Sequence, residues 1–128
     1  MRFELIDRVL EQDEDSLTGI KTVTAAEEYL GDHFPGFPVL PGVMMLESLV
    51  QAGRLFVAGL EKSPAQPLVV TQVRNVRYGN MVRPGQALKV QVTLRKHDDA
   101  GYDFQGVGTV DEKVAVQGRF RLEPLNNA

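Results

Sequence analysis

Two side chains, His33 and Glu47, are the strongest candidates for acid/base chemistry in this sequence of 128 residues. Histidine changes charge near neutral pH, and a carboxyl group that stays protonated can deliver a proton, so together they can take one proton and give another. His33 lies in a proline-rich segment, and Glu47 lies among apolar residues of a predicted helix. Burial there would favour the protonated form of Glu47. The pair indicates general acid/base catalysis.

Each candidate also has a purely structural interpretation. His33 would then hydrogen-bond the local backbone, and Glu47 would be a buried carboxylate with a structural partner. The other histidine, His97, stands at the end of a polar strand beside two aspartates, and a solvated strand end explains it best.

Three further residues could assist the chemistry. Gly42 and Val43 follow Pro41 at the predicted helix start, where backbone N–H groups have no partner inside the helix and can receive a carbonyl oxygen that gains negative charge. Gln51 lies four residues after Glu47, on the same helix face, and could orient the carboxylate. The structural alternatives are an ordinary helix start with a glycine in a tight loop, and a polar group that fills a helix contact.

The composition limits other functions. The absence of cysteine excludes thiolate chemistry and disulfides, and it suits a reducing cytosol. The sequence has no metal-ligand spacing, phosphate loop or dinucleotide fingerprint, and Ser48 lacks the context of a serine nucleophile. A net charge of −3 argues against nucleic acid or an anionic membrane as partner. We also expect no secretory signal and no membrane span.

The elements that must position these residues follow from the hydrophobic pattern. Residues 2–9 and 17–24 predict strands on either side of an acidic solvated turn at 11–15. Residues 25–30 predict one helical turn. Residues 42–60 predict a helix that is apolar nearly all round and therefore buried.

Two other patterns complete the expected fold. Prolines at positions 35, 38 and 41 predict an ordered, extended loop over residues 31–42. Period-two alternation over residues 88–94, 102–110 and 114–122 predicts an antiparallel meander with one covered face. The simplest packing wraps a curved antiparallel sheet around the helix, which makes residues 1–128 a single α+β domain.

The segment HFPGFPVLPGVMMLESLVQA, residues 33–52, resembles the signature of the 3-hydroxyacyl-acyl carrier protein dehydratases of type II fatty-acid synthesis, the FabZ type. Residues 3–11 and 82–85 resemble the first strand and a later turn of the same family, so the similarity covers essentially the whole chain. Residues 78–81 depart from it, because YGNM replaces a more basic stretch. The resemblance implies the hotdog fold, in agreement with the hydrophobic pattern.

Carried over residue by residue, the resemblance assigns His33 and Glu47 as the catalytic pair. Gly42 and Val43 match the positions whose amides contact the thioester carbonyl, and Gln51 matches the glutamine that supports the glutamate. The related dehydratase/isomerase branch has aspartate at the position of Glu47, so the glutamate favours the plain dehydratase.

The implied reaction is dehydration of a 3-hydroxyacyl thioester to a trans-2-enoyl thioester in fatty-acid or related acyl-chain biosynthesis. We expect an acyl carrier protein as the substrate's carrier, a homodimer or trimer of dimers, a cytoplasmic location, and no metal or redox cofactor. Arg74, Arg77 and Arg83 are candidate carrier contacts, since carrier proteins are acidic, although solvated strand-edge charges explain them equally well. The alternatives are a hotdog thioesterase, a hydratase acting on coenzyme A esters, and a non-catalytic acyl-binding homologue.

Overall fold

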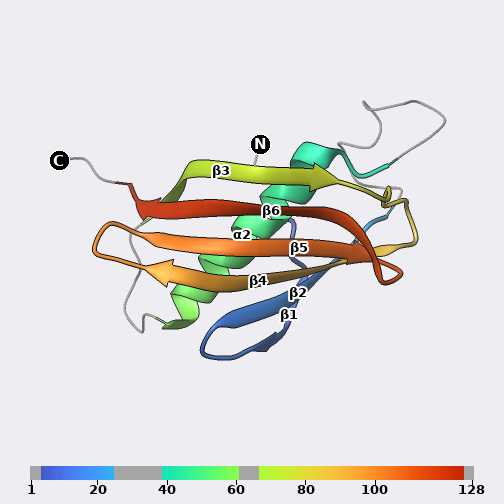
Figure 1. The fold of residues 1–128 in the computed structure, drawn as a ribbon. Coiled ribbons are helices and arrows are strands. Elements are labelled where there is room, and N and C mark those ends of the chain that lie inside the picture. The colour runs from blue at the N-terminus through green and yellow to red at the C-terminus, as the bar shows by residue number, and fades with distance from the viewer. Residues whose placement is uncertain (1–3, 25–38, 61–66, 126–128) are drawn as a thin grey trace.

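A six-stranded antiparallel sheet curves around one long helix (Figure 1). The computed structural model describes residues 4–24, 39–60 and 67–125. The strands lie in the order β1-β2-β4-β5-β6-β3, which confirms the α+β arrangement expected from the sequence. The elements are β1 (Arg8–Gln12), β2 (Ser16–Thr22), α2 (Gly42–Leu60), β3 (Leu68–Tyr78), β4 (Ala87–His97), β5 (Tyr102–Val110) and β6 (Lys113–Pro124).

The meander β4–β5–β6 carries the core, as its alternation predicts. Its inward-facing residues are buried, and the rings of Phe104 and Phe120 stack at 5.3 Å between centroids. Phe56 of α2 packs edge-on against Phe104 at 5.7 Å. A Cβ added at Gly106 would lie 3.1 Å from Leu49, so this glycine lets the helix approach the sheet closely.

The helix is buried on one side only, so the prediction of burial nearly all round is wrong. Its buried residues face the sheet, whereas Val43 is 66% exposed and Leu55 40% exposed. The helix is long and apolar enough to cross a membrane by length and composition alone, and 44% of its apolar window is buried within the fold. The exposed apolar residues on the uncovered side of α2 therefore need an explanation other than packing against the sheet.

The first strand begins later than predicted. β1 starts at Arg8 and continues through Glu11 and Gln12, which the acidic pattern had assigned to a turn. The turn is made by Asp13, whose carboxylate accepts hydrogen bonds from the backbone N–H groups of Asp15 and Ser16 at 2.9 and 2.8 Å. These bonds lower the pKa of Asp13. All five residues of β1 are exposed, so no hydrophobic alternation marks this edge strand.

The strand β3 was not predicted, and it forms the other edge of the sheet. It pairs with β6 alone, and the register shifts between Val70 and Gln72 and again between Arg74 and Arg77. Asn75, within the second shift, has a φ of 56°. These bulges interrupt the alternation that would reveal a strand. The outer edge of β3 is unpaired among the described strands.

Candidate active site

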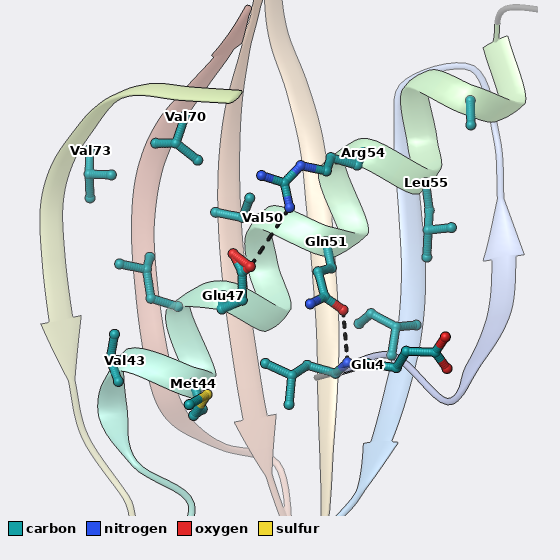
Figure 2. Close-up of a pocket in the computed structure, with 14 residues that line it drawn as sticks. Glu4, Val43, Met44, Glu47, Val50, Gln51, Arg54, Leu55, Val70 and Val73 are labelled. Carbon is teal, nitrogen blue, oxygen red and sulfur yellow. Dashed lines mark hydrogen bonds and ion pairs between the residues drawn. The ribbon is translucent and has the colours of Figure 1, made fainter. Parts of the chain in front are cut away.

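A groove of about 980 Å³ runs along the side of α2 that the sheet leaves uncovered (Figure 2). Its walls are the helix, the N-terminal segment at residues 4–6 and the inward face of β3. The lining is mainly apolar and carries a few polar side chains, a composition typical of small-molecule sites. The lining residues are Glu4, Leu5, Ile6, Val43, Met44, Leu46, Glu47, Val50, Gln51, Arg54, Leu55, Ala58, Val70 and Val73.

Glu47 lies in this groove, in the second turn of α2. Its side chain is 37% exposed, and Nη1 of Arg54 lies 3.7 Å from its Oε2 (Figure 2). The prediction that Glu47 is buried is therefore wrong for the single chain, because the sheet covers the opposite side of the helix. Ion pairs this exposed contribute little to stability. The carboxylate is thus available to a ligand in the groove.

Gln51 holds one wall of the groove. Its Oε1 accepts a hydrogen bond of 2.8 Å from the backbone N–H of Leu5, which is fully buried. The bond joins residues 46 positions apart and fixes the N-terminal segment against the helix. The predicted support of Glu47 by Gln51 stays a prediction.

The start of α2 presents two backbone donors. The carbonyl of Pro41 accepts from the N–H groups of Met44 and Met45 at 3.0 and 3.1 Å. Within the described ranges, no acceptor is found for the N–H groups of Gly42 and Val43. Such orphan donors, at the positive end of the helix dipole, favour a ligand oxygen that carries negative charge.

Tyr78 explains the glycine at position 42. A Cβ at Gly42 would lie 3.1 Å from Cε1 of the Tyr78 ring. The space left by the missing side chain is therefore filled by this ring. Tyr78 is half exposed and stands where the chain departs from the basic stretch of the resembled family.

The structure brings Val43, Glu47 and Gln51 into one groove, with Gly42 at the adjoining helix start. His33 lies outside the described residues, as do the helical turn predicted at 25–30 and most of the proline-rich loop. Arg54 is the groove residue that sequence reasoning missed. Its spacing of seven residues from Glu47, two helical turns on one face, was the available signal. No cluster of three or more potential metal ligands occurs in the part of the chain that is described.

Comparisons with known proteins show the family of the chain. The chain matches the FabA-like domain family over residues 1–119. It is 36% identical over 121 residues to the 3-hydroxyacyl-[acyl-carrier-protein] dehydratase FabZ of Caulobacter vibrioides, which covers 92% of this chain and 76% of the relative. The FabZ of Bacillus cereus is 35% identical over 116 residues, or 90% of this chain and 81% of the relative.

Solved structures share the fold at lower identity. The dehydratase heterocomplex ApeI:P from Xenorhabdus doucetiae matches with a TM-score of 0.82 and 21% identity, over 97% of this chain and 84% of the other. A hypothetical thioesterase from Streptococcus pneumoniae matches with a TM-score of 0.71 and 11% identity, over 93% and 85%. The fold alone thus does not separate dehydratases from thioesterases, but the sequence matches do. With a family match across nearly the whole chain and relatives above one-third identity over most of their length, the chain belongs to the FabA-like domain family, and FabZ-type dehydratases are its relatives.

Proposed function

We propose that this protein dehydrates 3-hydroxyacyl thioesters, delivered by an acyl carrier protein, to trans-2-enoyl thioesters. The observation that carries the proposal is the position of Glu47 in an apolar groove, one helical turn beyond the orphan amide donor of Val43. The relatives named as FabZ dehydratases support the same chemistry.

The geometry suits a thioester that lies along the helix. Val43 and Glu47 are four residues apart, which is about 6 Å along the helix axis. A carbonyl oxygen at the amides of Gly42 and Val43 would then leave the 3-hydroxyl group near the Glu47 carboxyl. The amides stabilise the negative charge that develops on the carbonyl oxygen when the C2 proton departs.

In the proposed reaction two protons move, and the C2–H and C3–O bonds of the substrate break. Neutral His33 takes the C2 proton, and the electron pair of that C–H bond forms the C2–C3 double bond. The C3–O bond breaks while Glu47, protonated or through a water molecule, gives a proton to the leaving oxygen. One water molecule is released for each enoyl thioester. The chain's own residues supply all of these steps.

A second copy of the chain would complete the site. The groove side of α2 leaves Val43 and Leu55 exposed, and Val73, Tyr78 and Met81 are exposed on or just after β3, whose outer edge has no partner among the described strands. Unpaired strand edges and contiguous apolar surface are features that proteins usually cover with a partner. We therefore expect a homodimer, either alone or as part of a trimer of dimers, with the groove at the interface. The resemblance to FabZ dehydratases also leads us to expect a cytoplasmic location.

One assay separates the proposed function from its rivals. The protein is mixed with a 3-hydroxyacyl thioester, and enoyl absorbance and free thiol are followed together. Enoyl product without thiol supports dehydration, whereas thiol without enoyl product identifies a thioesterase. Binding without either product identifies a non-catalytic acyl-binding protein. The same acyl group on an acyl carrier protein and on coenzyme A separates the dehydratase from a coenzyme A ester hydratase by the preferred carrier.

A further inference from the structure

Arg54 places a positive charge in a mainly apolar groove, beside the carboxylate of Glu47. The side chain is held at two points: Nε donates a 3.0 Å hydrogen bond to the carbonyl oxygen of Leu68, and Nη1 lies 3.7 Å from the Glu47 carboxylate. The guanidinium therefore reaches from the helix to the beginning of β3. Figure 2 shows the side chain pointing back along the helix toward Glu47 and away from Leu55.

The position of Arg54 relative to the substrate follows from the proposed function, on which this inference rests. With the thioester carbonyl at Val43 and the 3-hydroxyl group at Glu47, the remainder of the acyl chain continues in the same direction along α2. It meets the guanidinium within a few carbons of C3, because that group already lies beside Glu47. The groove continues beyond it over Leu55 and Ala58.

A saturated chain and a guanidinium are poorly matched neighbours. An alkyl chain that passes Arg54 would remove water from the charge without supplying any hydrogen-bond acceptor, which is costly for a charged group. At 34% exposure, the Arg54 side chain still has water to lose. An acyl group that ends before Arg54, or that carries an oxygen at this point, avoids the cost.

We propose that Arg54 is a specificity-determining residue that restricts the site to 3-hydroxyacyl groups that are short or carry a polar group soon after C3. The two fixed contacts matter to this role, since a side chain free to swing into solvent would not obstruct the groove.

The test compares acyl chains on one small carrier, pantetheine, which removes any effect of protein docking. Dehydration of the four-carbon and ten-carbon 3-hydroxyacyl thioesters is measured for the wild type, Arg54→Met and Arg54→Lys. We expect the wild type to prefer the shorter chain, and Arg54→Met to raise the ratio of kcat/KM for ten carbons over four by roughly tenfold or more, the effect of about 1.4 kcal/mol. Arg54→Lys retains the charge but loses the Nε hydrogen bond to Leu68, so its ratio should lie between those of the wild type and Arg54→Met.

Two controls keep the inference falsifiable. Arg8→Met removes an exposed arginine on β1, outside the groove, and should leave the ratio unchanged. A ten-carbon ether thioester, with an oxygen in the chain beyond C3, should be accepted by the wild type better than its all-carbon counterpart. Equal use of short and long chains by the wild type, or an unchanged ratio in a folded Arg54→Met protein, would overturn the role of Arg54.

Binding measurements separate this inference from the proposed function. Calorimetric titration with the saturated four-carbon and ten-carbon acyl thioesters gives the same comparison without turnover. If no variant dehydrates any substrate but Arg54→Met still gains affinity for the long chain, the proposed function fails and the role of Arg54 stands. If neither the catalytic nor the binding ratio responds to Arg54→Met, the role of Arg54 is wrong whatever the reaction is.

Discussion

Glu47 performs its proposed role from a half-exposed position, and this changes what must keep it protonated. In the single chain its carboxylate contacts Arg54 and faces a groove rather than the core. The substrate's acyl group and a second subunit are the components that would remove water around it. We therefore expect that dimerisation and substrate binding together create the environment that a general acid needs.

Exchange of the Glu47 carboxyl for an amide separates catalysis from folding. Glu47→Gln should reduce dehydration by roughly 10²–10⁴-fold, the usual contribution of a general acid or base. The helix should stay packed, since the only ion pair found for Glu47 in the described part of the chain is partly exposed. Turnover and the thermal midpoint are measured together. Glu11→Gln, an exposed glutamate on β1, is the matched control.

A thermal midpoint that collapses together with activity would make Glu47 a structural residue.

His33→Ala should cause a loss of dehydration activity of similar size, roughly 10²–10⁴-fold. A His33→Ala protein with nearly normal turnover would contradict the proposed mechanism.

The sequence predicted the site residues whose positions depend only on spacing within the helix. It did not predict contacts with residues that are distant along the chain. Spacing alone placed Glu47 and Gln51 on one face, and both line the groove. It could not show that Gln51 binds the backbone of Leu5, or that Tyr78 fills the space at Gly42, because those contacts join segments 46 and 36 residues apart. Arg54 was not identified, because its contact with β3 joins residues 14 positions apart.

At the scale of elements, the close contact between α2 and β6 fixes the helix that carries Glu47. A Cβ at Gly53 would lie 2.9 Å from the ring of Phe120 and 3.2 Å from a methyl group of Leu122, both in the core. Neither neighbour can move without disturbing the packing beneath the helix. The distance between the helix and the sheet therefore depends on this glycine.

Gly53→Ala should destabilise the fold by about 1–3 kcal/mol, the usual cost of overpacking, although alanine is the better helix former. Gly59→Ala is the control, because the atoms it would meet belong to the flexible end of Gln12. Chemical denaturation measures both variants. A Gly53→Ala protein as stable as the wild type would show that this contact does not limit how closely the helix packs against the sheet.

The outer face of the sheet has an electrostatic cluster centred on Arg121. Its guanidinium binds Asp98 at 2.7 Å, Asp103 at 3.0 Å and Glu123 at 2.7 Å. The hydrogen bond from Arg121, with the N–H groups of Ala100 and Gly101, lowers the pKa of Asp98 from 3.8 to about 2. The cluster joins β5, β6 and the turn after β4.

Arg121→Gln removes the largest cause of this shift, so the pKa of Asp98 should rise toward 3.8. A carboxyl group with a lowered pKa stabilises the folded state above pH 3.8, and the contribution is lost as the pH falls from 3.8 to about 2. The stability difference between wild type and variant should therefore shrink over that range. NMR titration and acid unfolding measure the two effects, with Arg95→Gln as control. An unmoved pKa would contradict the assignment.

The fold was predictable wherever one face of a strand is buried. β4, β5 and β6 alternate regularly, and their predicted ranges agree with the structure to within a few residues. β1 and β3 lie at the two edges of the sheet and have mostly exposed residues, so their positions depend on pairing rather than on hydrophobic pattern. The wall of the groove that β3 forms was therefore not predicted.

At the scale of the whole molecule, the charges that could receive an acidic carrier lie on separate surfaces. Arg74 lines a hollow of about 330 Å³ on the outer face of the sheet. Several other cationic side chains and one acidic side chain, that of Asp103, line the same hollow. Arg83 lines a different hollow, beside Lys113 and Asp111. The two arginines therefore report on different docking surfaces.

Charge reversal distinguishes these surfaces. If the carrier docks at the first hollow, Arg74→Glu should raise KM for a carrier-bound substrate, more strongly at low salt, and Arg83→Glu should not. Docking at the second hollow would give the opposite result. Neither variant should affect a pantetheine thioester. Equal effects on carrier-bound and small substrates would sink the docking hypothesis for that arginine.

The resemblance to the family implies that the histidine and glutamate of one site belong to different subunits, and mixing two inactive variants tests this expectation. His33→Ala and Glu47→Gln chains are combined and allowed to exchange subunits, which is confirmed separately with mass-tagged chains. If sites are shared in a two-fold symmetric dimer, each mixed dimer has one site with both substitutions and one site with neither. Random exchange makes about half of the dimers mixed, so roughly a quarter of wild-type activity should return. If each site lies within one chain, every site keeps one defect and no activity returns even after complete exchange. The outcome also decides what covers the groove beside β3, because a shared site requires the partner subunit to reach Glu47.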